Sequence, residues 1–410
     1  MYELNLRQVS YALSEALDLV GIDDLYHGKR VAFMSSVLSQ ELGHSQERVD
    51  YIISAGMLHD CGVSNTDIHK SLITELDWKD SQYHCIRGAL LLKSVTLYKK
   101  YSDTIFYHHT HWSDLELLKI DENIKIDANI ILLTDRVDAL RARGKSRAEI
   151  IVILEEQKSK MFHPKLIDIF KKISSPDAFW FYLDDTNIEF FLQKWIGKER
   201  KKSYSFKDLK EIAFMFSNIV DAKSYFTSEH SLNVSKVAVY LAKKLGLTEP
   251  EIELLELAGL LHDLGKLRVA DSILEKSGPL LTDDIKVMRR HSFDSEMILN
   301  KIDGFKEVAL LASLHHESLD GTGYPYQKTA EDLGMDARIL ILSDIFQALV
   351  QNRPYRKQLN PKKIIEILDE MRDSNKIDIN ILKIIKDNMD EVYSLANQNR
   401  YEYRIEDEEI

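Results

Sequence analysis

Leu257-Ala258-Gly259-Leu260-Leu261-His262-Asp263-Leu264-Gly265-Lys266 is the stretch around which the sequence is organised. A histidine and an aspartate stand side by side at the end of an apolar run, and a lysine follows the histidine by four residues. A buried imidazole and a buried carboxylate are each costly unless something satisfies them. The pattern therefore indicates a polar pair that binds a partner, and a metal ion is the obvious partner.

The same pattern occurs in the first half of the chain, where Ala55-Gly56-Met57-Leu58-His59-Asp60-Cys61-Gly62 matches Ala258 to Gly265. Among the histidines that match between the halves, the first two are 32 residues apart (59 − 27 and 262 − 230), and the third precedes a histidine pair by 24 (108 − 84 and 315 − 291). Histidine makes up only 14 of the 410 residues, so these intervals indicate a duplicated domain. The repeated polar set is His27, His59, Asp60, His84, His108, His109 and Asp135 in the first half, and His230, His262, Asp263, His291, His315, His316 and Asp344 in the second.

The hydrophobic pattern of the sequence has the period of an α-helix. Apolar residues recur at intervals of three and four in 31–42 and in 234–245, as on one face of an amphipathic helix. Gly43 and Gly246 are expected to end these helices, and Thr248 to cap the next one. No stretch alternates with a period of two for long enough to predict a sheet. We therefore expect an all-α fold of tandem helical domains.

Breaks in the helical pattern indicate the domain boundaries. Ser174-Ser175-Pro176-Asp177 interrupts the pattern, and a charged run follows at 198–203. We expect an N-terminal domain at 1–175, a connecting segment at 176–205 that is helical from Phe179 to Trp195, a second domain at 206–400 and an acidic tail at 401–410. We also expect the first domain to dock on the second.

Composition limits the class of protein. With 410 residues, 44% of them hydrophobic, and only seven prolines, the chain is expected to fold into several domains with cores of their own. The first twenty residues lack a basic region, and no run reaches the roughly 18 apolar residues of a membrane span. We therefore expect neither a signal peptide nor a membrane anchor.

Charge and cysteine content limit the cellular compartment and the classes of partner that we expect for the chain. A net charge of −12 argues against a protein that wraps duplex nucleic acid, so an anionic ligand would need a local site built from metal or arginine. The two cysteines, Cys61 and Cys85, have no CxxC spacing, and we expect them to serve ordinary packing in a reducing compartment. A cytoplasmic protein is the natural expectation.

The ligand chemistry of the repeat points to a reaction. Five imidazoles and two carboxylates per half form a mixed nitrogen and oxygen set that suits iron, manganese, zinc or nickel better than calcium or magnesium. Seven ligands are too many for one ion, whereas a carboxylate such as Asp263 can bridge two ions about 3.5 to 4 Å apart. Such a pair lowers the pKa of bound water and stabilises a departing oxygen. The set therefore predicts phosphoester hydrolysis.

Residues 221–360 resemble the HD-GYP branch of the HD metal-dependent phosphohydrolase superfamily. His262 to Lys266 matches the motif HDxGK, and the run from His315 to Pro325, HHESLDGTGYP, matches HHExxDGxGYP. Arg353-Pro354-Tyr355-Arg356 matches the RPYR segment of the family. The resemblance implies a cytoplasmic bacterial signalling enzyme, a phosphodiesterase that hydrolyses cyclic dinucleotides, chiefly cyclic di-GMP and possibly the mixed GMP-AMP compound.

The resemblance also implies roles for individual residues. The seven polar residues of the second half match the metal ligands of the family, which implies two divalent transition-metal ions, iron or manganese, with Asp263 bridging them. Lys266 matches a lysine that holds the scissile phosphate, and Arg353 and Arg356 match positions that grip the substrate's phosphates. Gly323 and Tyr324 belong to the substrate-binding loop, where glycine lets the backbone approach a ligand.

Departures from the family pattern refine these expectations. Phe226 stands where some members have a glutamate and a third metal, so we expect two metals. Asn233 stands where the family often has an arginine, which removes one phosphate contact. In the first half Val63 replaces the lysine, and Thr110 to Asp114 replaces the GYP segment.

The first half could therefore hold metal without hydrolysing the substrate, or could retain its polar set as a packing scaffold. Its candidate ligands are His27, His59, Asp60, His84, His108, His109 and Asp135. Two other functions remain for the whole chain: hydrolysis of a different phosphoester, and a receptor that binds a cyclic dinucleotide without turnover. The sequence leaves open the native metal, the preferred cyclic dinucleotide, a linear or mononucleotide product, and the oligomeric state.

Overall fold

The computed structural model of the chain describes residues 1–20, 26–63, 65–223, 229–352 and 356–397. Among these residues the fold is helical, and the strands β1 (Tyr2–Leu4) and β2 (Lys202–Tyr204) pair in a two-stranded sheet. The predicted all-α class is confirmed. The small sheet was not predicted because three residues are too few to display a period of two. Phe226, Arg353 and the expected tail 401–410 lie outside the described residues.

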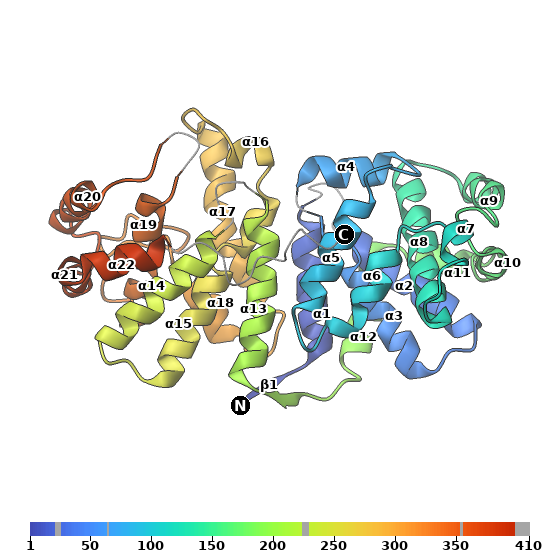
Figure 1. The fold of residues 1–410 in the computed structure, drawn as a ribbon, viewed down its shortest axis with the longest axis horizontal. Coiled ribbons are helices and arrows are strands. Elements are labelled where there is room, and N and C mark those ends of the chain that lie inside the picture. Colours follow the sequence, from blue (N-terminus) through green and yellow to red (C-terminus); the bar gives the residue numbers. More distant parts are fainter. Residues whose placement is uncertain (21–25, 64, 224–228, 353–355, 398–410) are drawn as a thin grey trace. The chain divides into compact units, whose positions relative to one another are not determined.

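Contacts divide the chain into two compact units, Leu4–Lys202 and Ser203–Ile410, and Met1–Glu3 belongs to the second of them. The helices of each unit can be followed by label in Figure 1. No helix within the described ranges combines the length and the apolar character that crossing a bilayer demands.

The N-terminal unit consists of helices of 3 to 21 residues that follow one another through short connections. They are α1 (Leu6–Asp18), α2 (His27–Glu41), α3 (Gln46–Leu58), α4 (Thr66–Thr74), α5 (Gln82–Lys93), η1 (Lys99–Tyr101), α6 (Ser102–Tyr107), α7 (Trp112–Leu115), α8 (Glu122–Ala142), α9 (Arg147–Glu156), α10 (Pro164–Ile173), α11 (Asp177–Phe181) and α12 (Asp185–Ile196).

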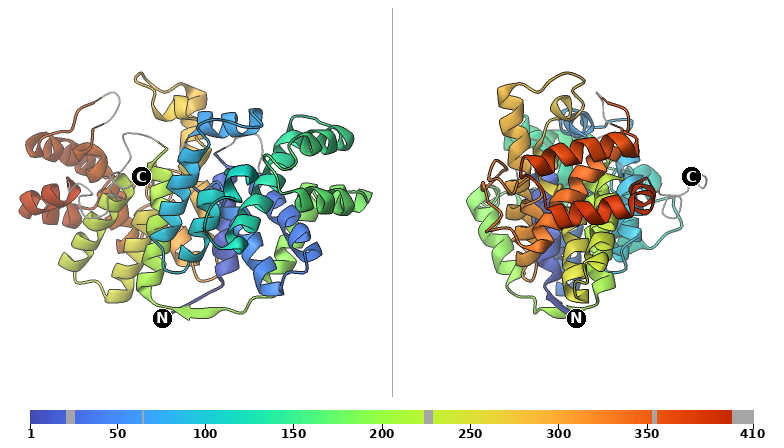
Figure 2. Two further views of the ribbon diagram at one scale, coloured as in Figure 1. Left: turned by 45° about the vertical axis from the view of Figure 1, so that its right-hand side comes forward. Right: turned by 90° about the vertical axis from the view of Figure 1, so that its left-hand side faces the viewer.

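The C-terminal unit repeats the order of the first helices. Its elements are α13 (Phe206–Asp221), α14 (His230–Lys244), α15 (Glu249–Leu261), η3 (Leu264–Arg268), α16 (Asp271–Leu274), α17 (Thr282–Leu299), α18 (Lys306–Ser313), α19 (Met335–Val350), α20 (Pro361–Asp373), α21 (Ile379–Asp387) and α22 (Met389–Ala396). Helices α20, α21 and α22, red and orange in Figure 2, pack on α14 and α19.

A close helix crossing forms the centre of each unit. Helix α2 packs on α3 and α8, and α14 packs on α15 and α19. A Cβ atom on Gly259 of α15 would lie 2.8 Å from Ser235 Cα of α14, so only glycine permits this approach. The crossing brings the C-terminal end of α15, where His262 follows, against the first turn of α14, which begins at His230.

The helix ends follow the predicted signals. Gly43 and Gly246 have φ values of 77° and 76°, the left-handed conformation that ends helices α2 and α14. Thr248 and Glu251 form a capping box at the start of α15. These predictions are confirmed.

The segment that we expected to connect the domains belongs to the N-terminal unit. Residues 176–202 fall within Leu4–Lys202 and form α11 and α12. Phe179, Ile188 and Leu192 are buried, and the ring of Phe33 in α2 lies 6.0 Å from that of Phe179. The reason is the apolar content of the segment. Its large hydrophobic side chains are more stable when they are buried against a domain than when they are exposed in a linker.

Candidate metal centres

The repeated polar residues of the C-terminal unit come from five places in the fold and meet in one buried cluster. His230 is the first residue of α14, and His262 and Asp263 follow the last residue of α15. The remaining four lie in α17, in the turn after α18, and in α19: His291, His315, His316 and Asp344. Four of the five histidines and both aspartates are buried.

The cluster contains two groups of potential ligands joined by one carboxylate. In the first group His230 Nε2 lies 3.1 Å from Asp344 Oδ1 and 3.3 Å from His262 Nε2. In the second, His291 Nε2 lies 3.0 Å from His315 Nε2, and His316 completes the group. Asp263 Oδ2 is 3.3 Å from His262 Nε2, and its Oδ1 is 3.4 Å from His291 Nε2. One oxygen of Asp263 therefore faces each group.

The hydrogen bonds of the rings show that the cluster fits metal ions. Nδ1 of His262, His291 and His315 donates to a backbone carbonyl three residues earlier, at 2.8, 2.5 and 2.7 Å. Each Nε2 then presents a lone pair, and two lone pairs 3.0 Å apart repel unless a cation lies between them. Asp263 Oδ1 is buried with no hydrogen-bond partner, as a carboxylate oxygen awaiting a cation would be.

Protonation states in the cluster suit ligation. Burial lowers the pKa of His291 to about 3 and the pKa of His316 to about 4, so both rings are neutral at pH 7. Burial alone would raise the pKa of Asp263, but the charges of His262 and Lys266 outweigh it and hold that pKa well below its usual range. The neutral rings of His291 and His316 and the ionised carboxylate of Asp263 are the forms that bind metal. Burial opposes the charged form of His262, but Asp263 raises the pKa of that ring, which would give up its proton when a metal binds.

Lys266 lies at the edge of the cluster on the short helix η3. Its Nζ is 2.5 Å from Asp263 Oδ2, and 14% of its side chain remains exposed. Helix η3 packs tightly on α17, because a Cβ atom on Gly265 would lie 2.1 Å from the carbonyl oxygen of His291. The lysine is thus held beside the bridging carboxylate with its ammonium group able to reach a ligand.

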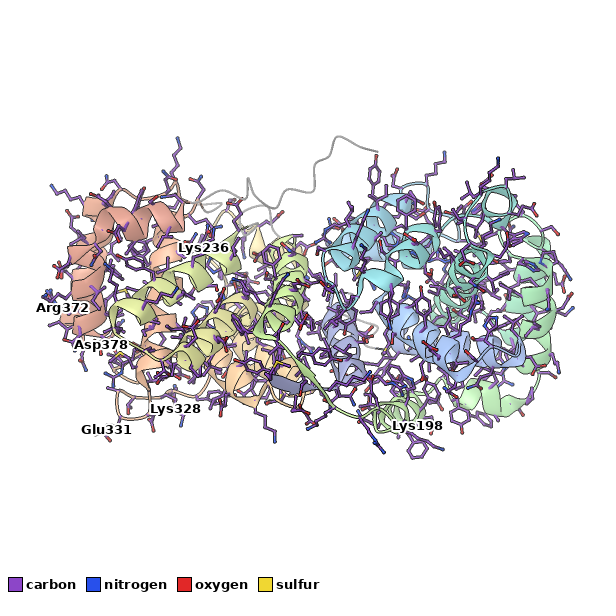
Figure 3. The ribbon with its side chains drawn as sticks, turned by 60° about the horizontal axis from the view of Figure 1, so that its bottom comes forward. Lys198, Lys236, Lys328, Glu331, Arg372 and Asp378 are labelled. Carbon is purple, nitrogen blue, oxygen red and sulfur yellow. The ribbon has the colours of Figure 1, made fainter. Side chains whose placement is uncertain are left out.

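The Gly-Tyr-Pro loop closes one side of the cluster. The ring of Tyr324 lies 4.8 Å from that of His316, and the Tyr324 N–H donates to the His316 carbonyl oxygen at 3.0 Å. The carboxylate of Glu317 accepts from the backbone N–H groups of Tyr326 at 2.6 Å and Lys328 at 2.8 Å. A Cβ atom on Gly323 would lie 2.4 Å from Glu317 Cα, so this glycine serves the loop's own packing. Lys328 and Glu331, labelled in Figure 3, lie farther along the loop.

Two arginines make contacts that the sequence analysis did not predict. The guanidinium group of Arg356 donates to the carbonyl oxygens of Ala348 at 2.6 Å and Leu349 at 3.1 Å, in the last turn of α19. Arg289, which the sequence analysis did not single out, is exposed and lies 5.2 Å from the ring centre of Tyr324. Its one sequence signal was its place two residues before His291, since the family motifs do not include it.

The N-terminal unit repeats this geometry. His27 Nε2 lies 3.3 Å from Asp135 Oδ1, and His59 completes a first group. His84 Nε2 lies 3.2 Å from His108 Nε2 and 3.3 Å from Asp60 Oδ1, and His109 joins them. As in the other unit, Nδ1 of the second histidine, His59, donates to a carbonyl oxygen, that of Gly56, at 2.7 Å. The residues that the repeat predicted to cluster therefore do so in both halves.

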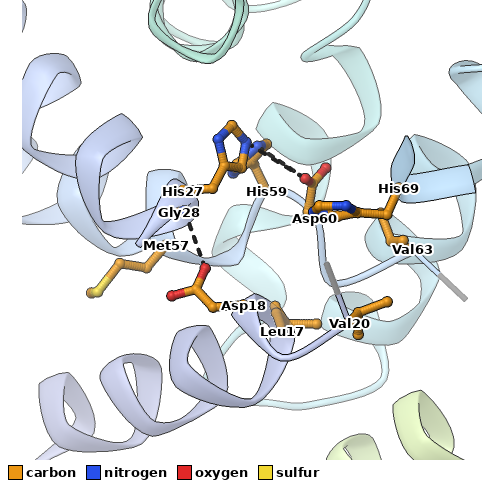
Figure 4. Close-up of a pocket in the computed structure, with 10 residues that line it drawn as sticks. All are labelled: Leu17, Asp18, Val20, His27, Gly28, Met57, His59, Asp60, Val63 and His69. Atoms are coloured by element: carbon orange, nitrogen blue, oxygen red, sulfur yellow. Dashed lines mark hydrogen bonds and ion pairs between the residues drawn. The ribbon is translucent and has the colours of Figure 1, made fainter. Parts of the chain in front are cut away.

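The surroundings of the N-terminal cluster differ. Arg136, at the position of Ile345, donates to Asp135 Oδ2 at 2.7 Å. Val63, at the position of Lys266, helps to line a small cavity with His27, His59 and Asp60, which Figure 4 shows. Val63 carries no charge, and Arg136 is already paired with Asp135, so neither residue offers a free cation to a phosphate beside Asp60.

Comparisons with known proteins agree with this division. The profile of the HD domain matches residues 24–140, and a second HD domain profile matches residues 215–381. A 3'3'-cGAMP-specific phosphodiesterase 1 of Vibrio cholerae is 32% identical over 96% of this chain and 94% of its own length. A cyclic di-GMP phosphodiesterase response regulator, RpfG of Xanthomonas campestris, is 37% identical over 36% of this chain and 40% of its own. In fold, the crystal structure of the cyclic GMP-AMP specific phosphodiesterase V-cGAP3 of Vibrio cholerae covers 97% of this chain and 98% of its own, with 22% identity and a TM-score of 0.64.

Proposed function

Since this chain belongs to the HD-GYP family of HD-domain phosphodiesterases, we propose that its C-terminal half hydrolyses a cyclic dinucleotide to the linear dinucleotide. The observation that carries the proposal is the position of Asp263, with one oxygen toward each group of histidines and Lys266 against its side. The N-terminal half has the same ligands but neither the lysine nor the Gly-Tyr-Pro loop.

The ligand set has room for two divalent ions, which would activate water and stabilise the departing oxygen when bound. His230, His262 and Asp344 would hold one ion, and His291, His315 and His316 the other. Asp263 orients both groups through its two oxygens. The nitrogen-rich set favours iron or manganese over magnesium.

The groups around the cluster would bind the substrate. Lys266 can turn its ammonium group from Asp263 toward a phosphate, because its side chain is partly exposed. The guanidinium group of Arg289 stacks on Tyr324 of the Gly-Tyr-Pro loop. The aromatic ring would suit a nucleobase of the substrate, and the guanidinium group would suit a phosphate. Arg353 and Arg356 stay candidates for phosphate contacts, and Arg356 would first have to leave the carbonyl groups of α19.

We propose the mixed 3'3' GMP-AMP compound as a substrate beside cyclic di-GMP. The support is that a relative matching both halves of this chain is named for it, whereas RpfG, which is named for cyclic di-GMP, matches about a third of the chain. The reaction would take place in the cytoplasm, where the two unpaired thiols would stay reduced. Docking of the N-terminal domain on the catalytic one stays a prediction.

A substrate panel tests the proposal. Metal-replete protein is incubated with 3'3'-cGAMP, cyclic di-GMP and a linear dinucleotide, and the products are separated by chromatography. We expect linear dinucleotide from at least one cyclic substrate. Tight binding of a cyclic dinucleotide without any product would show that the chain is a receptor and not an enzyme. Failure to cleave either cyclic dinucleotide would reject the proposal.

A further inference from the structure

The N-terminal half contains a sulfur donor that the C-terminal half lacks. Cys85 follows His84 in α5, at the position that Ser292 holds after His291 in α17. Its Sγ is buried, 3.9 Å from His84 Nε2 and 4.0 Å from His108 Nε2. In the other half Ser292 Oγ lies 3.4 Å from His291 Nε2. The two clusters therefore differ at one atom that faces the histidine nitrogens.

The distances fit a four-coordinate ion of the zinc class. Bonds of about 2.3 Å to sulfur and about 2.0 Å to nitrogen or oxygen place a tetrahedral sulfur and nitrogen about 3.6 Å apart, and two nitrogens about 3.3 Å apart. The two Sγ–Nε2 distances are 3.9 and 4.0 Å, and His84 Nε2 lies 3.2 Å from His108 Nε2. The distance from His84 Nε2 to Asp60 Oδ1 is 3.3 Å. Small side-chain movements would bring these four atoms onto one ion.

The groups around Asp60, which lies beside His84, indicate that a cation belongs in this cluster. Asp60 pairs, among the described residues, with three histidines, and Val63 replaces the lysine that neutralises Asp263 in the other half. His59 is 1% exposed, and its Nε2, which faces Asp60 at 3.4 Å, has no hydrogen-bond partner. A partly buried carboxylate whose ion-pair partners are histidines, beside a buried and unpartnered ring nitrogen, is the environment of a metal ligand set.

We propose that Cys85 is a metal ligand and that, with His84, His108 and Asp60, it gives the N-terminal half a centre for a thiophilic divalent cation of the zinc class. The thiol of Cys85 now donates to the Ser81 carbonyl oxygen at 3.4 Å, and it would release this proton to solvent as the thiolate binds. Thiolate selects zinc-like ions over manganese, so the two halves hold different metals. This assignment replaces the packing role that the sequence suggested for Cys85.

Cobalt substitution of the full-length protein tests the assignment. Cobalt bound to a thiolate absorbs in the near ultraviolet by charge transfer, and cobalt bound to nitrogen and oxygen alone does not. The chain has only two cysteines, so the origin of such a band can be assigned with two variants. We expect the band in the wild-type protein reconstituted with Co²⁺ under anaerobic conditions, its loss in Cys85→Ser, and its retention in Cys61→Ser.

Zinc content gives a second measurement. Cys85→Ser restores the hydroxyl that the other half carries, and we expect it to bind about one zinc ion fewer per chain than the wild type. Absence of the charge-transfer band in wild-type protein saturated with Co²⁺ would overturn the assignment without any variant. Persistence of the band in Cys85→Ser would overturn it too. Neither spectrum depends on hydrolysis, so this assignment and the proposed function stand or fall separately.

Discussion

Lys266, which stands where the other half has Val63, is the difference that bears on phosphate chemistry between two clusters of the same geometry. Asp263 has a lysine against one oxygen, and Asp60 has a valine nearby instead. Imidazoles and carboxylates that could hold metal are present in both clusters. Only the C-terminal cluster adds an ammonium group that can meet a phosphate and neutralise its developing charge.

Replacing this lysine should slow the reaction without emptying the metal site. We expect Lys266→Met to lower kcat by about 10²- to 10³-fold, the usual effect of losing one electrostatic contact to the transition state. Metal content should stay at the wild-type value. Val63→Ala, at the equivalent place in the other half, is the control and should keep the wild-type kcat. A fall in metal content that matches the loss of rate would make Lys266 a structural residue.

Arg289 should act on substrate binding. Its guanidinium group lies over Tyr324, away from the ligand nitrogens, so we expect Arg289→Ala to raise KM by about 10-fold with a smaller change in kcat. Lys286→Ala removes an exposed charge from the same helix and should leave KM unchanged. Equal effects of the two variants would mean that the general charge of α17, and not Arg289, matters.

The clustering of the repeated polar residues could be predicted from the sequence because their spacing is the same in both halves, and this spacing can be read without any knowledge of contacts. Arg289 and Glu317 could not be assigned their contacts in this way. Arg289 meets Tyr324 only because α17 and the loop pack together, and Glu317 receives its two N–H groups only when the loop has folded back. Contacts of this kind depend on tertiary structure.

At the scale of elements, long helices followed the predicted period, and short elements did not. Helices α2 and α14 begin at the first ligand histidine and end at a left-handed glycine, so their ends were readable. Helix η3 has five residues and no readable period, although it carries Lys266. Its position depends on the tight contact at Gly265 and on Lys223, which donates to the carbonyl oxygen of Leu267.

The pH dependence of stability should report on Lys223. Burial lowers its pKa from 10.5 to about 8. Below pH 8 the folded and unfolded chains both hold this proton, and between about pH 8 and 10.5 only the unfolded chain does. The lysine's contribution to the free energy of unfolding therefore rises with pH across that window. Urea unfolding at pH 7.5 and 9.5 should show wild type gaining stability relative to Lys223→Met.

The matched control is Lys207→Met, which changes an exposed lysine of α13. The difference between this variant and the wild type should be the same at both pH values. Parallel behaviour of the two variants would contradict the lowered pKa of Lys223 in the folded protein.

At the scale of the whole molecule, the chain contains two units with separate cores and one cluster each. Their helical ligand geometry is shared, so the duplication explains the fold, and the added lysine, loop and arginine explain why one unit is proposed to be catalytic. The segment that the sequence analysis read as a connection forms α11 and α12, whose apolar side chains pack on α2, and the sequence pattern alone does not show this contact.

Metal removal should destabilise the protein. An ion that binds only the folded state at about 100 times its Kd adds about 2.7 kcal/mol, which corresponds to roughly 5 to 10 °C in Tm for a unit of this size. We expect chelation to lower Tm by this amount and Mn²⁺ to restore it, whereas Mg²⁺ should restore little. An unchanged Tm after complete chelation would mean that the clusters are packing scaffolds.

The most direct measurement compares two equivalent aspartates in the metal-replete, full-length protein. The rate of linear dinucleotide formation from 3'3'-cGAMP and cyclic di-GMP is measured for wild type, Asp263→Ala and Asp60→Ala, with circular dichroism to check folding. We predict that Asp263→Ala loses at least about 10³-fold in rate, whereas Asp60→Ala keeps most of it. Retention of activity in folded Asp263→Ala, or its loss in Asp60→Ala alone, would contradict a catalytic centre in the C-terminal half.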